Sequence, residues 1–200
     1  MLVLILGIVV FLGIHSFATI RTARARLIER IGLNPYKGLF SLVAAIGLAL
    51  IVWGFMRYRA AGMIVIWEPP AWTHHVTVAL MWFAFVSLAA SHAKSGEIKG
   101  WLRHPMLVAV KTWALAHLLA NGDLGGMILF GAFLLWGGYD RIAVKRRGDM
   151  GAPRGTPYAR SDVIVLVAGT VAWIAMMFAH PYLIGVAVAP WSRYVGPQYK

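Results

Sequence analysis

The sequence predicts an all-α protein, a polytopic membrane helix bundle of about six transmembrane helices. Of its 200 residues, 60% are hydrophobic and only 13% are charged, whereas a soluble domain carries about a quarter charged residues. The apolar residues gather in runs of roughly 16–25 residues, close to the ~20 that a helix needs to cross a bilayer. Backbone groups in lipid must bond within their own segment, and the alternation of a barrel strand is absent, so these runs predict helices.

Six predicted spans follow one another along a single integral membrane domain of residues 1–200. The first lacks the positively charged start of a secretory signal, so we expect it to stay uncleaved. The fourth is short and the sixth is long, so the end of the sixth is expected in the membrane interface. The expected spans are residues 2–20, 38–56, 74–93, 105–121, 124–140 and 162–189.

The connections between the spans alternate in charge. Fourteen of the 19 lysines and arginines lie in residues 21–37, 94–104 and 141–161, and few lie in the other connections and the tail. Positively charged loops stay in the cytoplasm, so we expect both termini on the opposite side. The net charge of +12 is therefore attributed to topology, and no nucleic-acid partner is expected.

Two histidines lie inside predicted spans, where ionisable side chains are costly and usually face the bundle interior. His15 lies in the first span and His117 in the fourth. A lone buried histidine is more often a hydrogen-bonded structural group, but two on different spans raise the odds of a ligand pair. Four others lie at or near span ends, where hydration or hydrogen bonding accounts for them: His74, His75, His92 and His180.

The inventory of ligands favours haem over zinc. Neutral imidazole binds both, but catalytic zinc normally has three protein ligands, and the chain has no cysteine and no HExxH motif. Haem needs one or two axial ligands and suits an aromatic-rich bundle core. On a rise of about 1.5 Å per residue, His15 lies ~9 Å and His117 ~20 Å from the cytoplasmic ends of their spans. That offset requires a strongly tilted macrocycle, unless a span end is misplaced or one histidine is not a ligand.

The fourth span begins with Arg103-His104-Pro105. Proline is ordinary in a first helical turn, so these residues are either a basic interfacial cap or an anion site. In the second case Arg103 and His104 would hold a haem propionate or the carboxylate of a nucleotide-like cofactor.

The segments GIHSFA (13–18), GLNPYKGLFSLVAAIGLAL (32–50), WEPPAW (67–72) and RHPMLVAVKTWALAHLLANGDL (103–124) resemble the NnrU family of bacterial membrane proteins. The match covers about residues 1–140. A more distant resemblance is to the plant zeta-carotene isomerase. The NnrU resemblance implies a multi-pass protein of the bacterial inner membrane, with periplasmic termini, that is associated with denitrification and nitric oxide metabolism. It also implies a respiratory or denitrification membrane enzyme as a partner.

The isomerase resemblance implies haem b as the cofactor, held between two axial histidines that align with His15 and His117. Electron transfer, gas sensing or a redox-dependent, isomerase-like reaction would follow. The isomerases have a cysteine three residues before the second ligand, where this chain has Ala114. A ligand switch to cysteine is therefore excluded, and carotenoid isomerisation is in doubt.

Two alternatives remain. Arg-His-Pro at the start of a late span also resembles the S-adenosylmethionine-dependent membrane methyltransferases of the isoprenylcysteine type, although residues 140–159 lack their paired glutamates. The other alternative is a cofactor-free scaffold for a respiratory enzyme.

Overall fold

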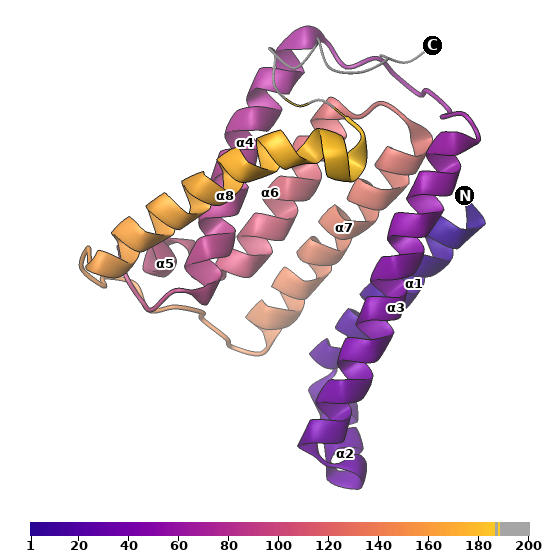
Figure 1. Cartoon of the computed structure of the whole chain (residues 1–200). Helices are drawn as coiled ribbons and strands as arrows, with labels where there is room; N and C mark the ends of the chain where they lie inside the picture. The colour runs from indigo at the N-terminus through magenta and orange to yellow at the C-terminus, as the bar shows by residue number, and fades with distance from the viewer. Residues whose placement is uncertain (187, 189–200) are drawn as a thin grey trace. The chain divides into compact units, whose positions relative to one another are not determined.

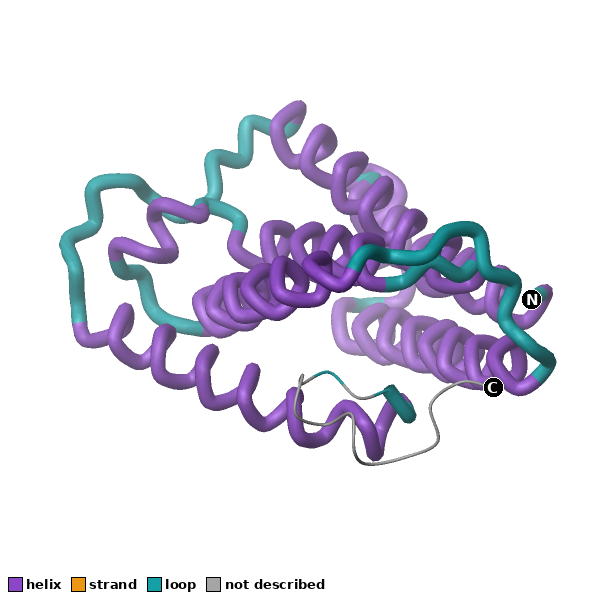
Figure 2. The backbone as a smooth tube through the Cα atoms, turned by 90° about the horizontal axis from the view of Figure 1, so that it is seen from above, coloured by secondary structure: helices purple, strands orange, loops and turns teal. Residues whose placement is uncertain are grey.

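The computed structural model describes residues 1–186 and 188, and in this part of the chain the regular elements are helices joined by loops (Figures 1 and 2). The helices are α1 (Leu2–Thr19), α2 (Arg21–Ile31), α3 (Leu33–Ala60), α4 (Ala71–His92), α5 (Glu97–Leu102), α6 (Pro105–Ala120), α7 (Leu124–Arg146) and α8 (Arg160–Ile184). The predicted all-α fold is confirmed.

Five of the described helices, namely α1, α3, α4, α7 and α8, are long and apolar enough to cross a membrane. The predicted fourth span is present as α6, which is apolar but has only 16 residues. The described part of the chain therefore has the helices of a membrane protein, five of them of spanning length and one apolar but shorter. The end of the predicted sixth span, together with Arg193 and Lys200, lies outside the described residues.

Two helices occupy segments that the sequence interpretation treated as connections. α2 is rich in arginine and alanine and has no buried residue, and α5 is a six-residue helix that begins at Glu97. Both lack the length of a membrane span, but arginine, alanine and leucine are good helix formers. The loop 61–70 interrupts the helices at WEPPAW, where two prolines precede α4 and α4 starts directly after Pro70.

The described chain divides into two compact units, each built from two separate stretches of sequence. Unit 1 contains residues 1–69 and 121–149, and unit 2 contains residues 70–120 and those from 150 onward. Unit 1 therefore holds α1, α2, α3 and α7, and unit 2 holds α4, α5, α6 and α8.

In unit 1, α1 and α3 run antiparallel with their backbones in contact (Figure 1). A Cβ atom added at Gly47 would lie 2.7 Å from the backbone nitrogen of Phe11. Gly54 lies in the same way against Leu4, and Gly7 against Ile51. The numbers in each pair add up to 58, so a single antiparallel register holds along the contact. Small residues permit this close approach of two membrane helices.

In unit 2, α4 packs against both α6 and α8. Val86, Ala90 and Val165 form a buried apolar cluster, and a Cβ atom at Gly169 would lie 2.7 Å from the Cα atom of Val86. The absence of a side chain at Gly169 thus permits the close packing of α8 against α4. The Thr77 hydroxyl donates to the Ala116 carbonyl at 2.9 Å and ties α4 to α6.

Candidate functional site

His15 lies in unit 1, half-buried, among aromatic rings from three helices. Its ring centroid is 4.3 Å from that of Phe11, 5.1 Å from that of Phe40 and 5.8 Å from that of Trp136. Its Nδ1 atom is 2.7 Å from the Phe11 carbonyl oxygen. Because a carbonyl oxygen only accepts, Nδ1 carries the proton, and a neutral ring keeps its lone pair on Nε2.

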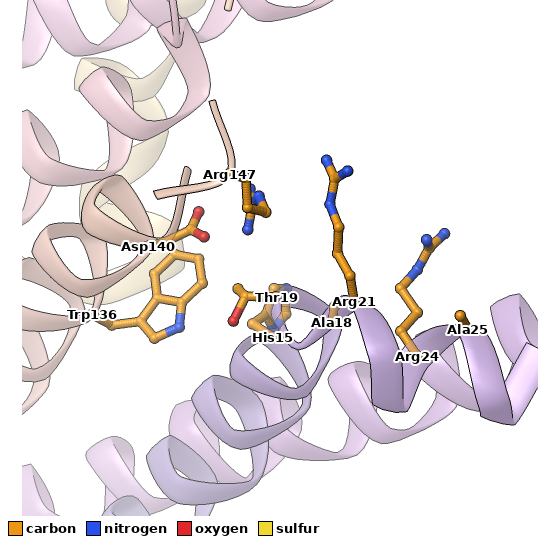
Figure 3. Close-up of a pocket in the computed structure, with 9 residues that line it drawn as sticks. All are labelled: His15, Ala18, Thr19, Arg21, Arg24, Ala25, Trp136, Asp140 and Arg147. Atoms are coloured by element: carbon orange, nitrogen blue, oxygen red, sulfur yellow. The ribbon is translucent and has the colours of Figure 1, made fainter. Parts of the chain in front are cut away.

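A cavity of about 640 Å³ opens beside His15. Its lining residues come from α1, α2 and α7 and the residue after α7, and Figure 3 shows them around a common space. They are His15, Ala18, Thr19, Arg21, Arg24, Ala25, Trp136, Asp140 and Arg147. Three arginines face one aspartate, so the lining carries a formal excess of two positive charges. The cavity can therefore receive a ligand that is apolar at one end and anionic at the other.

Two of these arginines, Arg24 and Arg147, differ in their surroundings. The Arg24 guanidinium lies over the Tyr36 ring, 5.4 Å from its centroid, a distance at which cation–π attraction operates. The Nε atom of Arg147 is buried and has no hydrogen-bond partner in the described part of the chain. A buried donor of this kind is costly unless a ligand or water accepts its hydrogen bond.

The wall of the cavity is fixed by hydrogen bonds between α1 and α7. Trp136 donates from Nε1 to the Ser16 hydroxyl at 3.1 Å. Thr19 donates to the Ser16 carbonyl at 2.7 Å, and its hydroxyl is 3.3 Å from that of Tyr139. These contacts set the position of Trp136 beside the His15 ring.

His117 lies in unit 2, on α6, and uses the same pattern of hydrogen bonding as His15. Its Nδ1 atom donates to the carbonyl oxygen of Trp113, one turn earlier, at 2.8 Å. The Trp113 ring centroid is 5.4 Å from that of His117. In a neutral ring the lone pair is again on Nε2. Ala114, which stands where the isomerases have cysteine, is completely buried.

Arg103 and His104 form a tight turn in unit 2, between α5 and α6. Arg103 has φ 61° and ψ −53°, and the His104 amide donates to the Leu102 carbonyl at 2.7 Å. This is a γ-turn of the rare, strained kind. Such strain persists where the surroundings hold it in place and is frequent at functional sites.

The segment 150–152 holds this turn. Arg103 donates from Nε to the Met150 carbonyl at 2.7 Å, and its own carbonyl accepts from the Ala152 amide at 2.8 Å. The Nε2 atom of His104 is buried without a hydrogen-bond partner in the described residues. Pro105 is the first residue of α6, as expected.

The Asn121-Gly122-Asp123 turn belongs to unit 1. Asp123 caps α7 by accepting from the Gly126 amide at 2.8 Å. The Gly122 carbonyl accepts from the amides of Ile66 and Trp67. The turn therefore anchors the WEPPAW loop in addition to reversing the chain.

Among the described residues, no group of three or more histidine, cysteine, aspartate or glutamate side chains could hold a metal ion. A second cavity, of about 810 Å³, lies in unit 2 between α4, α5, the start of α8 and residues 154–158. Four of its lining residues are aromatic, namely Trp82, Phe83, Trp101 and Tyr158, and Trp82 donates to the Thr170 hydroxyl at 2.9 Å.

A sequence model of the NnrU family, described as NnrU protein, matches residues 3–188. The chain belongs to the NnrU family. The match extends beyond residue 140, where the resemblance seen in the sequence ended, and takes in α8. Neither the curated proteins nor the solved structures gave a match.

Within this NnrU protein, the structure groups the predicted site residues by unit. His15 lies in unit 1, whereas Arg103, His104 and His117 lie in unit 2. Arg103 and His104 lie in the turn before α6, and His117 lies on α6, ~20 Å from His104 along the helix axis at about 1.5 Å per residue.

The arginines beside His15 were missed by the sequence interpretation, which assigned Arg21, Arg24 and Arg147 to topology alone. A signal for them exists in the spacing on α7. Trp136, Asp140 and Arg147 are four and seven residues apart, so they lie on one face of the helix. An aspartate on that face inside an apolar span marks it as a functional surface.

Proposed function

We propose that this NnrU protein binds haem b with His15 and His117 as axial ligands and serves one-electron chemistry in the bacterial inner membrane. The observation that carries the proposal is the shared hydrogen-bond pattern of the two rings. Each donates from Nδ1 to the carbonyl four residues earlier. Metal-ligating histidines almost always donate their other ring N–H to a carbonyl or carboxylate, which fixes the tautomer and the ring orientation.

The surroundings of His15 fit an iron porphyrin. The aromatic rings around it offer an apolar contact surface, and the adjacent cavity of about 640 Å³ is within the size range of cofactor sites. When bound, haem would supply a one-electron redox couple. The residues of the chain would orient both imidazoles through the carbonyl oxygens of Phe11 and Trp113.

The resemblance to NnrU proteins supports denitrification or nitric oxide metabolism as the context of this proposed activity. His15 and His117 would together leave no open coordination position for a substrate, so we infer electron transfer as the primary role. Gas sensing or an isomerase-like reaction would require one histidine to leave. The charge pattern supports cytoplasmic connections after α1, α4 and α7, with the N-terminus in the periplasm.

The test is the visible spectrum of the full-length protein, purified in detergent after expression with ample haem precursor. We expect a sharp α-band on reduction, as for low-spin haem with two nitrogen ligands. His15→Ala and His117→Ala should each abolish or broaden the band, because each removes one axial ligand. Added imidazole should restore it by filling the vacant position.

His74→Ala is the matched control, because His74 is exposed in the first turn of α4. An unchanged spectrum in His15→Ala or His117→Ala would reject that residue as a ligand. Absence of haem from the wild-type protein, combined with binding of S-adenosylmethionine, would favour the methyltransferase alternative. Absence of both would favour a scaffold.

A further inference from the structure

The cavity beside His15 has a charged end that the axial ligands do not explain. Arg21 and Arg24 reach it from α2, and Arg147 reaches it from the residue after α7 (Figure 3). Arg141, Lys145 and Arg146 share the run of charge at the end of α7 but do not line the cavity. The fold therefore places only three of the nearby basic residues at the cavity.

The chemistry of this end points to carboxylate recognition. Guanidinium groups bind carboxylates through planar pairs of hydrogen bonds. The buried Nε of Arg147 is a donor without an acceptor in the described chain, which is the arrangement expected when the acceptor is a ligand. The formal excess of two positive charges in the lining matches the two carboxylates of one haem b.

We propose that Arg21, Arg24 and Arg147 form the binding site for the propionates of haem b, with Arg147 making the most buried contact. This proposal rests on haem binding at His15. It moves the anion site from Arg103, whose Nε donates to the Met150 carbonyl, to the arginines that share a cavity with the axial ligand.

Asp140 allows a second test of the proposal, because its charge is opposite to that of the arginines. Its carboxylate lines the same cavity and opposes the arginines without forming an ion pair with them in the described structure. It lowers the attraction for an anion at this point. Loss of its charge should therefore act in the opposite direction to loss of an arginine charge.

The first experiment compares haem b with its dimethyl ester, in which both propionates are uncharged. Full-length apoprotein in detergent is titrated with each, and the low-spin spectrum is recorded. Since a hydrogen bond between charged groups is strong, we expect the wild-type protein to bind haem b at least about tenfold more tightly than the ester. In Arg147→Gln the preference should fall by on the order of tenfold, whereas Arg147→Lys should keep part of it.

Arg26→Gln is the matched control, because Arg26 is exposed on α2 and lies outside the cavity. It should leave the preference unchanged. Asp140→Asn should strengthen it.

The second experiment measures the haem midpoint potential, which does not depend on turnover. Positive charge near the iron stabilises the reduced state. Arg147→Gln should lower the potential and Asp140→Asn should raise it, each on the order of tenfold in the reduction equilibrium, or 59 mV for one electron.

The possible outcomes separate the two proposals. Failure of the wild-type protein to bind either porphyrin would reject haem binding itself. Equal binding of haem b and its ester by the wild-type protein would overturn only the propionate site. Shifts of the midpoint potential with the same sign in Arg147→Gln and Asp140→Asn would also overturn it. Removal of a positive charge and removal of a negative charge should shift the potential in opposite directions, whereas a change of packing would not depend on the sign of the charge.

Discussion

Asp162 joins two helices through a single buried carboxylate, and its replacement by alanine is expected to destabilise unit 2 strongly. The side chain is 1% exposed. One oxygen accepts from the Glu97 amide at 3.1 Å and from the Ala159 amide at 2.8 Å, and the other accepts from the Ile98 amide at 2.8 Å. The carboxylate therefore caps the start of α5 and the start of α8 together.

The magnitude follows from the number of amides that lose their acceptor. One N-cap is worth about 0.5–2 kcal/mol, so three amides correspond to roughly 2–5 kcal/mol in Asp162→Ala. A six-residue helix does not form without tertiary support, so we expect α5 to unfold first. Asp162→Asn keeps one acceptor oxygen and should cost less.

The matched control is Asp123→Ala, since Asp123 caps only one described amide, that of Gly126. Its cost should be about 1 kcal/mol. Stability is measured by unfolding in mixed detergents, and hydrogen exchange is followed on peptides that contain Glu97 and Ile98. Equal costs for the two alanine variants, or unchanged protection of these two amides in Asp162→Ala, would refute the reasoning.

Three other changes test the packing and the topology. Gly47→Leu should separate α1 from α3 and lower the unfolding midpoint, because its Cβ would lie 2.7 Å from the Phe11 backbone. Gly13→Leu is its control, since nothing lies within 4 Å of a Cβ there, and a destabilisation as large as that of Gly47→Leu would contradict the predicted register. Arg103→Gly should relieve the strain of the positive φ but lose the hydrogen bond to the Met150 carbonyl. Amide hydrogen exchange of residues 150–152 should therefore become faster, while the free energy of unfolding should change by less than about 1 kcal/mol. Reporter fusions after α2 and in the loop 61–70 should report cytoplasm and periplasm respectively, and the reverse result would overturn the assigned orientation.

The sequence was sufficient to predict the apolar helices, because a span needs a long hydrophobic run whatever its neighbours are. It also placed the helix start at Pro105 and the break at WEPPAW, because proline acts locally. Neither α2 nor α5 was predicted. α2 has no buried residue, and α5 depends on an acceptor, Asp162, that is 65 residues away from Glu97.

The candidate site was predicted only in part, for a similar reason. An imidazole inside an apolar run stands out in a sequence, so His15 and His117 could be selected. The positive charge of an arginine after a span is already explained by its position in a cytoplasmic loop. Only the packing of α2 and α7 around α1 shows that Arg147 lines the cavity and Arg146 does not. Whether the two histidines bind one haem stays a prediction.

Because the two units alternate along the sequence, the parts of unit 1 are synthesised at different times. The ribosome completes α1 and α3 early, but Trp136, Asp140 and Arg147 follow only after all of α4, α5 and α6. At about 5–20 residues per second, the gap between His15 and Trp136 lasts on the order of 6–25 seconds. The cavity beside His15 thus forms only late in translation. A nascent chain that stops before α7 would expose the His15 imidazole without the rest of the cavity lining.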